Sequence, residues 1–356
     1  MCVQLRVADF NEYYEYIVMM DVAQKKQQVL SLVQQGRLAP ARQIAAELVA
    51  ADSHDLQALW MLANINEMLG RFQDAEKCAR KMIQRILPDL AGAYGNLGRA
   101  LLGERRYAEA ADSFREALKL DPASASDRYL LAALGEAPLP SSSETASYVT
   151  SLFDMYATFF DDHIRKELKY EIPEALRSAV ASTLGESRTG LDILDLGCGT
   201  GLCGPLFRQW ARTLTGVDLS AGMLEKARQR RVYDELIHGD LLIPLNRPSA
   251  AFDVVIAADV FIYVGALDDV FERCRAVLRP AGIFAFSIES HEGEEDYLLR
   301  PSTRFAHSAR YVSYLAQQFG LDVVVQESTT VRYEQGSPVA GYLYLLSKPA
   351  NIADYP

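Results

Sequence analysis

The sequence predicts an α/β protein in two parts: an all-α region of helical repeats, then a doubly wound, mainly parallel sheet that ends in an antiparallel edge hairpin. Three observations predict this class. A unit of about 35 residues recurs in the first half, a Pro- and Ser-rich run follows it, and the second half alternates short apolar runs with helical patterns. At roughly 150 residues per domain, the 356 residues allow two domains of ordinary size.

The repeat in the first half has a fixed spacing. Leu38, Phe72 and Tyr107 hold the same place in three aligned segments and lie 34 and 35 residues apart. A unit of that length accommodates two helices and their turns. The first half is therefore expected to be a stack of helix pairs.

The third unit carries the fullest pattern. Ala110, Phe114 and Ala117 stand at i, i+4 and i+7 and so share one helical face, and Pro122 stops the helix. Together with residues 94–98, these positions resemble the tetratricopeptide repeat. The second unit is a fair match with a one-residue slip, and the first is recognisable mainly by its register. The alternative is a helical bundle with chance periodicity.

These patterns set the expected domains. Residues 1–135 are expected to hold a leading helix and about three tetratricopeptide-like (TPR) repeats. Residues 136–146 contain the run Ala-Pro-Leu-Pro-Ser-Ser-Ser, which favours a linker over a continuing helix. Residues 147–356 remain for the sheet domain and helices that precede it.

Seven short runs rich in branched apolar residues predict the strands of the second half. Most are separated by helical patterns, which predicts crossover connections and a parallel sheet with helices on both faces. No helix-length segment separates the last two runs, so these are expected to pair antiparallel at one edge. The runs are 191–196, 213–217, 236–238, 254–257, 283–288, 321–326 and 342–346.

A glycine-rich turn directly follows the first of these runs, where a backbone can approach a ligand closely. It contains Gly197, Gly199 and Gly201. The nicotinamide fingerprint needs a Gly or Ala where this chain has Leu202, and no GK[ST] follows, which excludes a P-loop. Asp195 would repel a pyrophosphate but suits a ligand with an ammonium or sulfonium charge.

An acid at the end of the second predicted strand completes the cofactor argument. Asp218 lies 23 positions after Asp195, where a carboxylate can accept both hydrogen bonds of a ribose diol. The expected ligand is an adenosine-like molecule without a diphosphate, and S-adenosylmethionine satisfies every one of these details.

At this point the chain resembles the class I S-adenosylmethionine-dependent methyltransferases, whose sheet is Rossmann-like. The resemblance rests on residues 195–201, Asp218, residues 238–241 and 252–259, and on the loop 278–282. It implies that the glycines hold the methionine portion and that Asp218 binds the ribose. Within the loop, Cys198 is a small residue that fits, because no His or Asp partner stands at a recognisable offset to make it a nucleophile.

The same resemblance implies further cofactor contacts. Asp240 would bind the adenine amino group with Leu241 beside the ring, and Met223 would cover the ribose or the adenine; a turn acid that caps a helix and a core methionine are the alternatives. Residues 148–163 resemble the lid helix of bacterial fusions of TPR repeats with a methyltransferase, which implies that Tyr156 and Phe160 close over the cofactor. The remaining residues assigned to the cofactor are Leu219, Gly239 and Ala257.

Candidates for the chemistry follow the fourth and fifth predicted strands, because open sheets bind ligands at the carboxyl ends of their strands. They are Asp259, Tyr263, Glu289, His291 and His307. His307 is the first choice as a base, since imidazole titrates near neutrality; a surface histidine is the alternative. Glu289 to Asp296 is acidic, but its spacing favours a solvated loop over a metal site, so no metal is expected.

Composition narrows the class of partner. The net charge of −11 divides into 16 Lys+Arg against 18 Asp+Glu in residues 1–140 and 20 against 29 in the rest, that is −2 and −9. An acidic balance opposes binding to a phosphate backbone, so no nucleic-acid partner is expected. The sequence contains no apolar segment long enough to predict a membrane span. Its five scattered cysteines favour a reducing cytoplasm over a disulfide framework.

The leading hypothesis is a methyltransferase that uses S-adenosylmethionine and acts by in-line displacement on an O, N, S or C nucleophile of a small molecule or carrier-bound metabolite. In that hypothesis the repeats serve dimerisation or shape the substrate entrance. One alternative is a protein or peptide methyltransferase that recruits its substrate, or a protein partner, through the TPR groove. Another is a non-catalytic scaffold that only senses the cofactor.

Overall fold

The computed structural model describes residues 7–85, 87–158, 160–161, 164, 170–185, 188–247, 249–334 and 336–350, with side chains from residue 19 onward. Residues 1–6 of the first predicted domain, residues 351–356 of the second, and parts of the lid segment 148–163 lie outside the described residues. The chain divides into two compact units after Glu136, and each is described by itself.

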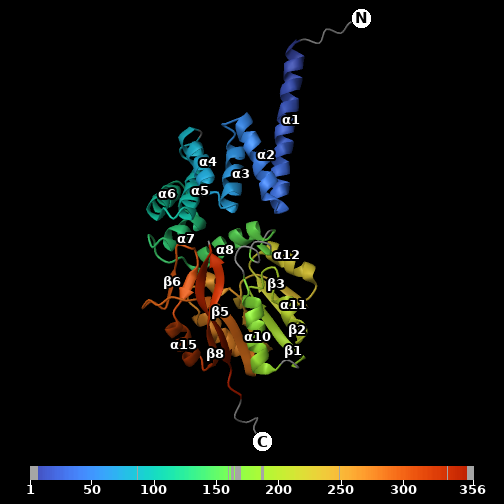
Figure 1. The fold of residues 1–356 in the computed structure, drawn as a ribbon, viewed down its shortest axis with the longest axis vertical. Coiled ribbons are helices and arrows are strands. Elements are labelled where there is room, and N and C mark those ends of the chain that lie inside the picture. Colours follow the sequence, from blue (N-terminus) through green and yellow to red (C-terminus); the bar gives the residue numbers. More distant parts are fainter. Residues whose placement is uncertain are drawn as a thin grey trace. The chain divides into compact units, whose positions relative to one another are not determined.

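The first unit consists of consecutive helices, drawn from blue to teal in Figure 1. Leu38, Phe72 and Tyr107 each begin a helix, so the 34- and 35-residue spacing is the spacing of α2, α4 and α6. The described helices are α1 (Val7–Gln34), α2 (Leu38–Ala51), α3 (Leu56–Met68), α4 (Phe72–Arg85), α5 (Ala91–Gly103), α6 (Tyr107–Leu120) and α7 (Ala125–Ala133).

Small residues let these helices approach closely. Ala110, Phe114 and Ala117 are fully buried on α6, as their common helical face predicts. A Cβ atom on Gly98 of α5 would stand 2.5 Å from the Phe114 ring, so only glycine admits that ring against the helix backbone. The periodic positions are therefore the packing positions of the stack.

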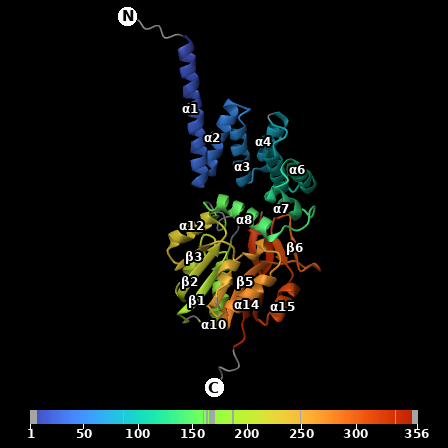
Figure 2. The same ribbon diagram turned by 180° about the vertical axis from the view of Figure 1, so that it is seen from behind.

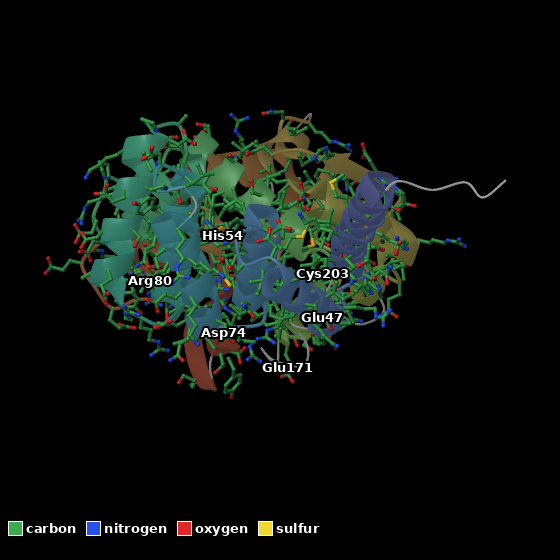
Figure 3. The ribbon with its side chains drawn as sticks, turned by 90° about the horizontal axis from the view of Figure 1, so that it is seen from above. Glu47, His54, Asp74, Arg80, Glu171 and Cys203 are labelled. Atoms are coloured by element: carbon green, nitrogen blue, oxygen red, sulfur yellow. The ribbon has the colours of Figure 1, made fainter. Side chains whose placement is uncertain are left out.

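Polar side chains connect one repeat to the next. Arg42 of α2 donates to Asn66 of α3 at 2.7 Å and to Asp74 of α4 at 3.3 Å. Arg106 contacts Glu76 at 2.9 Å. Figure 3 labels Asp74 on α4. Most of these pairs are partly exposed, so each contributes little stability, and the buried alanine face determines the stack.

The second unit begins with α8 (Ser142–Tyr156). Ser141 caps this helix: its Oγ accepts the Glu144 N–H, and the Glu144 carboxylate accepts the Ser141 N–H at 2.8 Å. A Ser followed three residues later by Glu is a capping box. Of the segment 136–146 expected as a linker, residues 142–146 are therefore helical.

A seven-stranded sheet in the order β3-β2-β1-β4-β5-β9-β8 forms the core of this unit. The first five strands in this order are parallel, β9 pairs antiparallel with β5, and β8 lies outside β9. The predicted doubly wound sheet with an antiparallel edge hairpin is confirmed. The strands are β1 (Leu191–Leu196), β2 (Ala211–Asp218), β3 (Glu235–His238), β4 (Phe252–Ala257), β5 (Leu278–Glu289), β8 (Asp322–Glu334) and β9 (Ser337–Ser347).

Helices cover both faces of the sheet, as crossover connections require. On one face, α10 (Ile172–Leu184) and α11 (Gly204–Phe207) pack against alternate strand residues such as Ile193. On the other, α14 (Asp268–Val277) and α15 (Ala309–Gln318) pack against the opposite set, such as Leu194. Figure 1 shows α10 in front of the sheet, and Figure 2, seen from behind, shows α14.

Short elements near the carboxyl ends of the strands complete the unit. They are α12 (Ala221–Arg230), α13 (Leu242–Leu245), the 3-10 turn η1 (Phe261–Tyr263), and a small hairpin of β6 (Tyr297–Leu299) and β7 (Phe305–His307). The hairpin was not predicted from the sequence, because each of its strands has three residues, too few for a periodic pattern.

Candidate cofactor and acceptor site

The glycine loop after β1 is held in a conformation that requires glycine. Gly197, Gly199 and Gly201 have φ angles of 58°, 55° and 82°. A Cβ atom at Gly197 would stand 2.7 Å from Val260, and one at Gly201 would stand 2.9 Å from the Tyr233 ring. At Gly199 nothing lies within 4 Å. The outer glycines thus serve internal packing, whereas the middle one presents bare backbone to open space.

Asp218, at the end of β2, is bonded to this loop. One carboxylate oxygen accepts the Gly199 N–H at 2.8 Å, and the other accepts the Ser220 N–H at 2.8 Å. Each oxygen keeps a further lone pair, which is what a ribose diol needs. Burial raises the pKa of Asp218, against the two backbone donors.

Asp195 is 1% exposed under the same loop. It accepts a hydrogen bond from the Tyr233 hydroxyl at 2.6 Å. Burial raises the pKa of this carboxyl group to about 7, and the neighbouring Asp218 adds to the effect. Tyr233 both supports Gly201 and donates to Asp195, and sequence reasoning missed it because a lone Tyr in a coil segment carries no motif.

The remaining residues assigned to the cofactor surround the ends of β2, β3 and β4. Gly239 has φ of 152°. Asp240 is exposed and accepts the Leu242 N–H at 2.8 Å, so one of its oxygens caps α13 as the turn-acid alternative describes. Leu241 packs against the core cluster around α14.

Four other members of the set lie in or beside the same edge. Met223 is buried at the start of α12, and its N–H donates to Ser220 Oγ at 3.1 Å. The Leu219 carbonyl faces the His238 ring, and Ala257 is buried at the end of β4. Burial raises the pKa of the Cys198 thiol well above its usual value, which keeps it protonated and unsuited to nucleophilic attack.

The expected lid helix α8 contacts this region from within the same unit. Asp154 accepts the Ser220 hydroxyl at 2.6 Å and the Gly222 N–H at 3.3 Å, so α8 is bonded to the start of α12. Phe160 contacts Tyr156 edge to face, with centroids 5.4 Å apart. Phe153 contacts Tyr263 in the same way at 5.2 Å. Aromatic side chains from the lid segment thus reach one of the candidate catalytic residues.

Asp259 and Glu289, two of the catalytic candidates, are joined through one arginine. Arg332 of β8 is 2% exposed; its Nη1 lies 3.1 Å from both Asp259 oxygens, its Nη2 contacts Glu289, and its Nε lies 2.8 Å from Glu334. Every nitrogen of the guanidinium is therefore in use. Asp259 itself has φ of 58°, a strained value for a residue with a side chain.

Two further arginines from the β6–β7 hairpin reach this cluster. Arg300 lies 3.4 Å from Glu289 and donates to the Ser290 carbonyl at 2.8 Å. Arg304 contacts Glu334, and Tyr263 and Glu334 raise its pKa against the effect of burial. We define Arg300, Arg304, Arg332, Asp259, Glu289 and Glu334 as the arginine cluster. Sequence reasoning found two of its acids and none of its arginines, which stand far apart in the chain.

His307 is fully buried on β7, which corrects the alternative of a surface histidine. Its Nε2 lies 3.0 Å and 2.9 Å from the Val264 and Gly265 carbonyls, so this nitrogen carries the proton and Nδ1 is the free acceptor. Burial lowers the pKa of His307 to about 4. The ring is therefore neutral at physiological pH.

The acidic segment after β5, considered from the sequence as a possible metal site, is largely exposed. His291 is 8% exposed, and its Nδ1 accepts the Gly293 N–H at 3.1 Å. Residues 292–296 are mostly exposed. Within the described ranges, no group of three or more His, Cys, Asp or Glu side chains could hold a metal ion. Of the helices described, none is both long and apolar enough to span a bilayer.

Comparison with known families agrees with this geometry. The sequence model of the family described as "Methyltransferase domain" matches residues 194–286, from the glycine loop to β5. Two models described as "Tetratricopeptide repeat" match residues 26–91 and 91–124.

Among similar proteins is a malonyl-[acyl-carrier protein] O-methyltransferase of Serratia marcescens, 34% identical over 122 residues, which are 33% of this chain and 47% of that protein. Another is a trans-aconitate 2-methyltransferase of Paracidovorax citrulli (strain AAC00-1), 31% identical over 107 residues, 30% of this chain and 41% of that protein. The chain thus spans less than half the length of either relative.

Among the solved structures similar to this chain is that of 1,6-didemethyltoxoflavin-N1-methyltransferase of Burkholderia thailandensis with bound 1,6-didemethyltoxoflavin and S-adenosylhomocysteine. It is 18% identical with a TM-score of 0.46, and the match covers 60% of this chain and 92% of that one.

The sheet order, the glycine loop and Asp218, together with the family match, define an S-adenosylmethionine-dependent methyltransferase domain. This chain carries that domain behind N-terminal tetratricopeptide repeats.

Proposed function

We propose that this chain transfers the methyl group of S-adenosylmethionine to a nucleophile of a small molecule or a carrier-bound metabolite. The observation that carries the proposal is the bond between Asp218 and the Gly199 N–H beside the bare backbone of the glycine loop. This bond holds the Asp218 carboxylate, which can accept hydrogen bonds from a diol, next to backbone that a ligand can approach closely. The two relatives support the acceptor class, since both are named for acidic small or carrier-bound acceptors.

The residues around the loop fit the cofactor. Gly199 leaves room for the methionine portion, and the two oxygens of Asp218 keep one free lone pair each for the ribose. Asp195, deprotonated, would balance the positive charge of the ligand. When bound, S-adenosylmethionine supplies an electrophilic methyl group: the bond from sulfur to methyl breaks, its electron pair stays on sulfur, and the acceptor forms the new bond.

This chain's own contribution to the transfer is mainly orientation, because alignment can lower a displacement barrier by about 7 to 11 kcal/mol. A base is needed only for an acceptor that arrives protonated. Asp259 and Glu289 are bonded to Arg332 and are poorly placed to take a proton. His307 keeps the free lone pair on Nδ1, so we assign it the base role for such an acceptor, with Tyr263 as a contact to the lid aromatics.

Calorimetric titration tests the proposal. The purified chain is titrated with S-adenosylmethionine, with S-adenosylhomocysteine, and with NADH as a control. We expect the first two ligands to bind with micromolar affinity and NADH to give no saturable heat. Binding of NADH alone, or of none of the three, would refute the cofactor assignment.

We propose the repeats as an interaction surface for a protein partner or for a second copy of the chain. Light scattering of the purified chain over a range of concentrations, with and without residues 1–136, measures the contribution of the repeats to dimerisation. If the number of chains per particle is the same with and without residues 1–136, the repeats do not mediate dimerisation, and binding of a protein partner is the role that remains.

A further inference from the structure

Unpartnered polar atoms concentrate in one short segment of the molecule. In the part of the chain that the structure describes, eight buried side-chain nitrogen or oxygen atoms have no hydrogen-bond partner, and four of them fall within residues 291–307. Buried polar atoms are normally bonded, so such a concentration points to a missing ligand or water. The four atoms are His291 Nε2, Ser302 Oγ, Arg304 Nε and His307 Nδ1.

The chemistry of these atoms favours a ligand rich in acceptors. Arg304 Nε–H can only donate. His291 Nδ1 accepts the Gly293 N–H, so its proton lies on Nε2, which is a second donor. The Ser302 hydroxyl can donate as well. Only His307 Nδ1 must accept, because its Nε2–H is used by two carbonyls.

The charges of the arginine cluster point the same way. Its three guanidinium groups balance its three carboxylates, and no carboxylate oxygen of the cluster is among the unpartnered atoms. The unpartnered hydrogen-bonding group within the cluster is thus the Arg304 Nε–H. An anion would therefore find a free charged donor there.

Arg300 and Arg304 are the members able to change partners. Arg332 uses all of its nitrogens on three carboxylates and is 2% exposed. Arg300 is one-third exposed and contacts Glu289 at only 3.4 Å, a long distance for an ion pair. Arg300 and Arg304 flank the turn between β6 and β7, and Ser290 at the end of β5 bridges to His307 of the same hairpin. The hairpin therefore carries these donors to the carboxyl ends of the strands, where open sheets bind ligands.

On these observations, and resting on the proposed methyl transfer, we propose that the acceptor bears a carboxylate, and that Arg304, assisted by Arg300, anchors it. Arg304 keeps an unpartnered Nε–H beside its contact with Glu334, and its planar group matches a carboxylate. Arg332 has a positioning role: it holds Asp259, Glu289 and Glu334 in ion pairs and offsets part of their charge, which would otherwise repel the anion.

The test measures carboxylate binding on the full chain saturated with S-adenosylhomocysteine. Calorimetry is performed with malonate, and with malonamide as a neutral analogue of similar shape. We expect saturable binding of malonate only. Arg304→Gln should weaken it about tenfold to hundredfold, the effect of losing a hydrogen bond to a charged group. Arg304→Lys, which keeps the charge but loses the planar group, should be intermediate.

Controls separate anchoring from folding and from the cofactor site. Arg310→Gln removes an exposed arginine on α15 that lies 3.5 Å from Asp296, and it should leave malonate binding unchanged. Each variant must bind S-adenosylhomocysteine as the unaltered chain does. Should Arg304→Gln fail to fold, Arg300→Gln takes its place, with an expected loss of about threefold to tenfold, the range of an ordinary hydrogen bond.

Equal binding of malonate and malonamide, or no malonate binding, would overturn the carboxylate assignment, and so would retention of affinity in Arg304→Gln. Failure of the proposed function has a different signature: it removes the S-adenosylhomocysteine heat itself. Malonate titrated into the chain without S-adenosylhomocysteine then still tests the anchor, with the same variants.

Discussion

The glycine loop after β1 and the arginine cluster beyond β5 lie near the carboxyl ends of the same sheet, yet they accommodate buried charge in different ways. In the loop, Asp195 and Asp218 are bonded to a phenol and to backbone N–H groups, and among the described residues neither forms an ion pair with a lysine or arginine. In the cluster, each carboxylate meets a guanidinium. The loop thus leaves a negative charge for a cationic ligand to neutralise, whereas the cluster is already neutral.

Replacing Arg332 should give the largest effect on stability. In Arg332→Met, three carboxylates lose a shared partner whose side chain is 2% exposed, so we expect a destabilisation of about 3 to 5 kcal/mol. Denaturation is followed by fluorescence in a Trp60→Phe background, which leaves Trp210 of the second unit as the remaining tryptophan.

A matched control is Arg228→Met, which breaks the pair with Glu225 on α12, where both side chains are about 60% exposed. An exposed pair contributes roughly 0 to 1 kcal/mol. Similar losses in the two variants would mean that the cluster is no more than a set of surface pairs.

The pH dependence of stability should differ in sign between Asp195 of the loop and His307 of the β6–β7 hairpin. The pKa of Asp195 is raised to about 7, so between pH 4 and 7 the folded chain holds a proton that the unfolded chain releases, and stability falls as pH rises. The pKa of His307 is lowered to about 4, so between pH 4 and 6.5 the unfolded chain holds the extra proton, and stability rises with pH. Each effect is limited to about 1.4 kcal/mol per pH unit.

Variants separate these opposed slopes. Asp195→Asn should make the rise of stability with pH steeper, and His307→Gln should make it shallower. Denaturant midpoints measured from pH 4.5 to 7 provide the slopes. Changes of the same sign in both variants would contradict the assigned protonation states. In the unaltered chain, binding of the cationic cofactor should strengthen as pH rises toward 7, because it requires the Asp195 carboxylate.

Replacing Asp218, the residue assigned to the ribose, should have a smaller effect, on cofactor affinity. Asp218→Ala removes the acceptor of the Gly199 and Ser220 N–H groups as well as of the diol, so we expect S-adenosylhomocysteine to bind with a loss of about 1 to 3 kcal/mol. Asp240→Ala, at an exposed acid that also caps α13, is the comparison. Equal losses would place the main polar contact elsewhere.

The smallest expected effect concerns the bare backbone of the loop. Gly199→Ala meets no atom but must adopt φ near 55°, at a cost of about 1 to 2 kcal/mol. Gly201→Ala has a similar strain and also contacts the Tyr233 ring, so it should destabilise the apo chain more. Gly199→Ala should instead lose more cofactor affinity than Gly201→Ala. A reversed order of affinities, measured by calorimetry, would mean that the ligand approaches the other side of the loop.

The repeats show how far a periodic sequence carries a structural prediction. Leu38, Phe72 and Tyr107 begin helices because the same local pattern recurs, and each helix contacts mainly its neighbours in the chain. Helix α8 could be predicted only in part. Its Ser141 and Glu144 form a capping box that the expected linker concealed, since prolines and serines nearby gave the stronger signal.

By itself, the sequence determined the two-part architecture, the antiparallel hairpin at one edge of the sheet and the cofactor class. In each case the information lies in contiguous residues: a helical period, an alternating run, or a glycine loop whose backbone forms the site. Only the tertiary structure decided the arginine cluster, the buried neutral state of His307 and the Tyr233 bond to Asp195. These depend on side chains from β4, β5, β7 and β8, and on burial, which changes hydration and pKa through atoms remote in the chain.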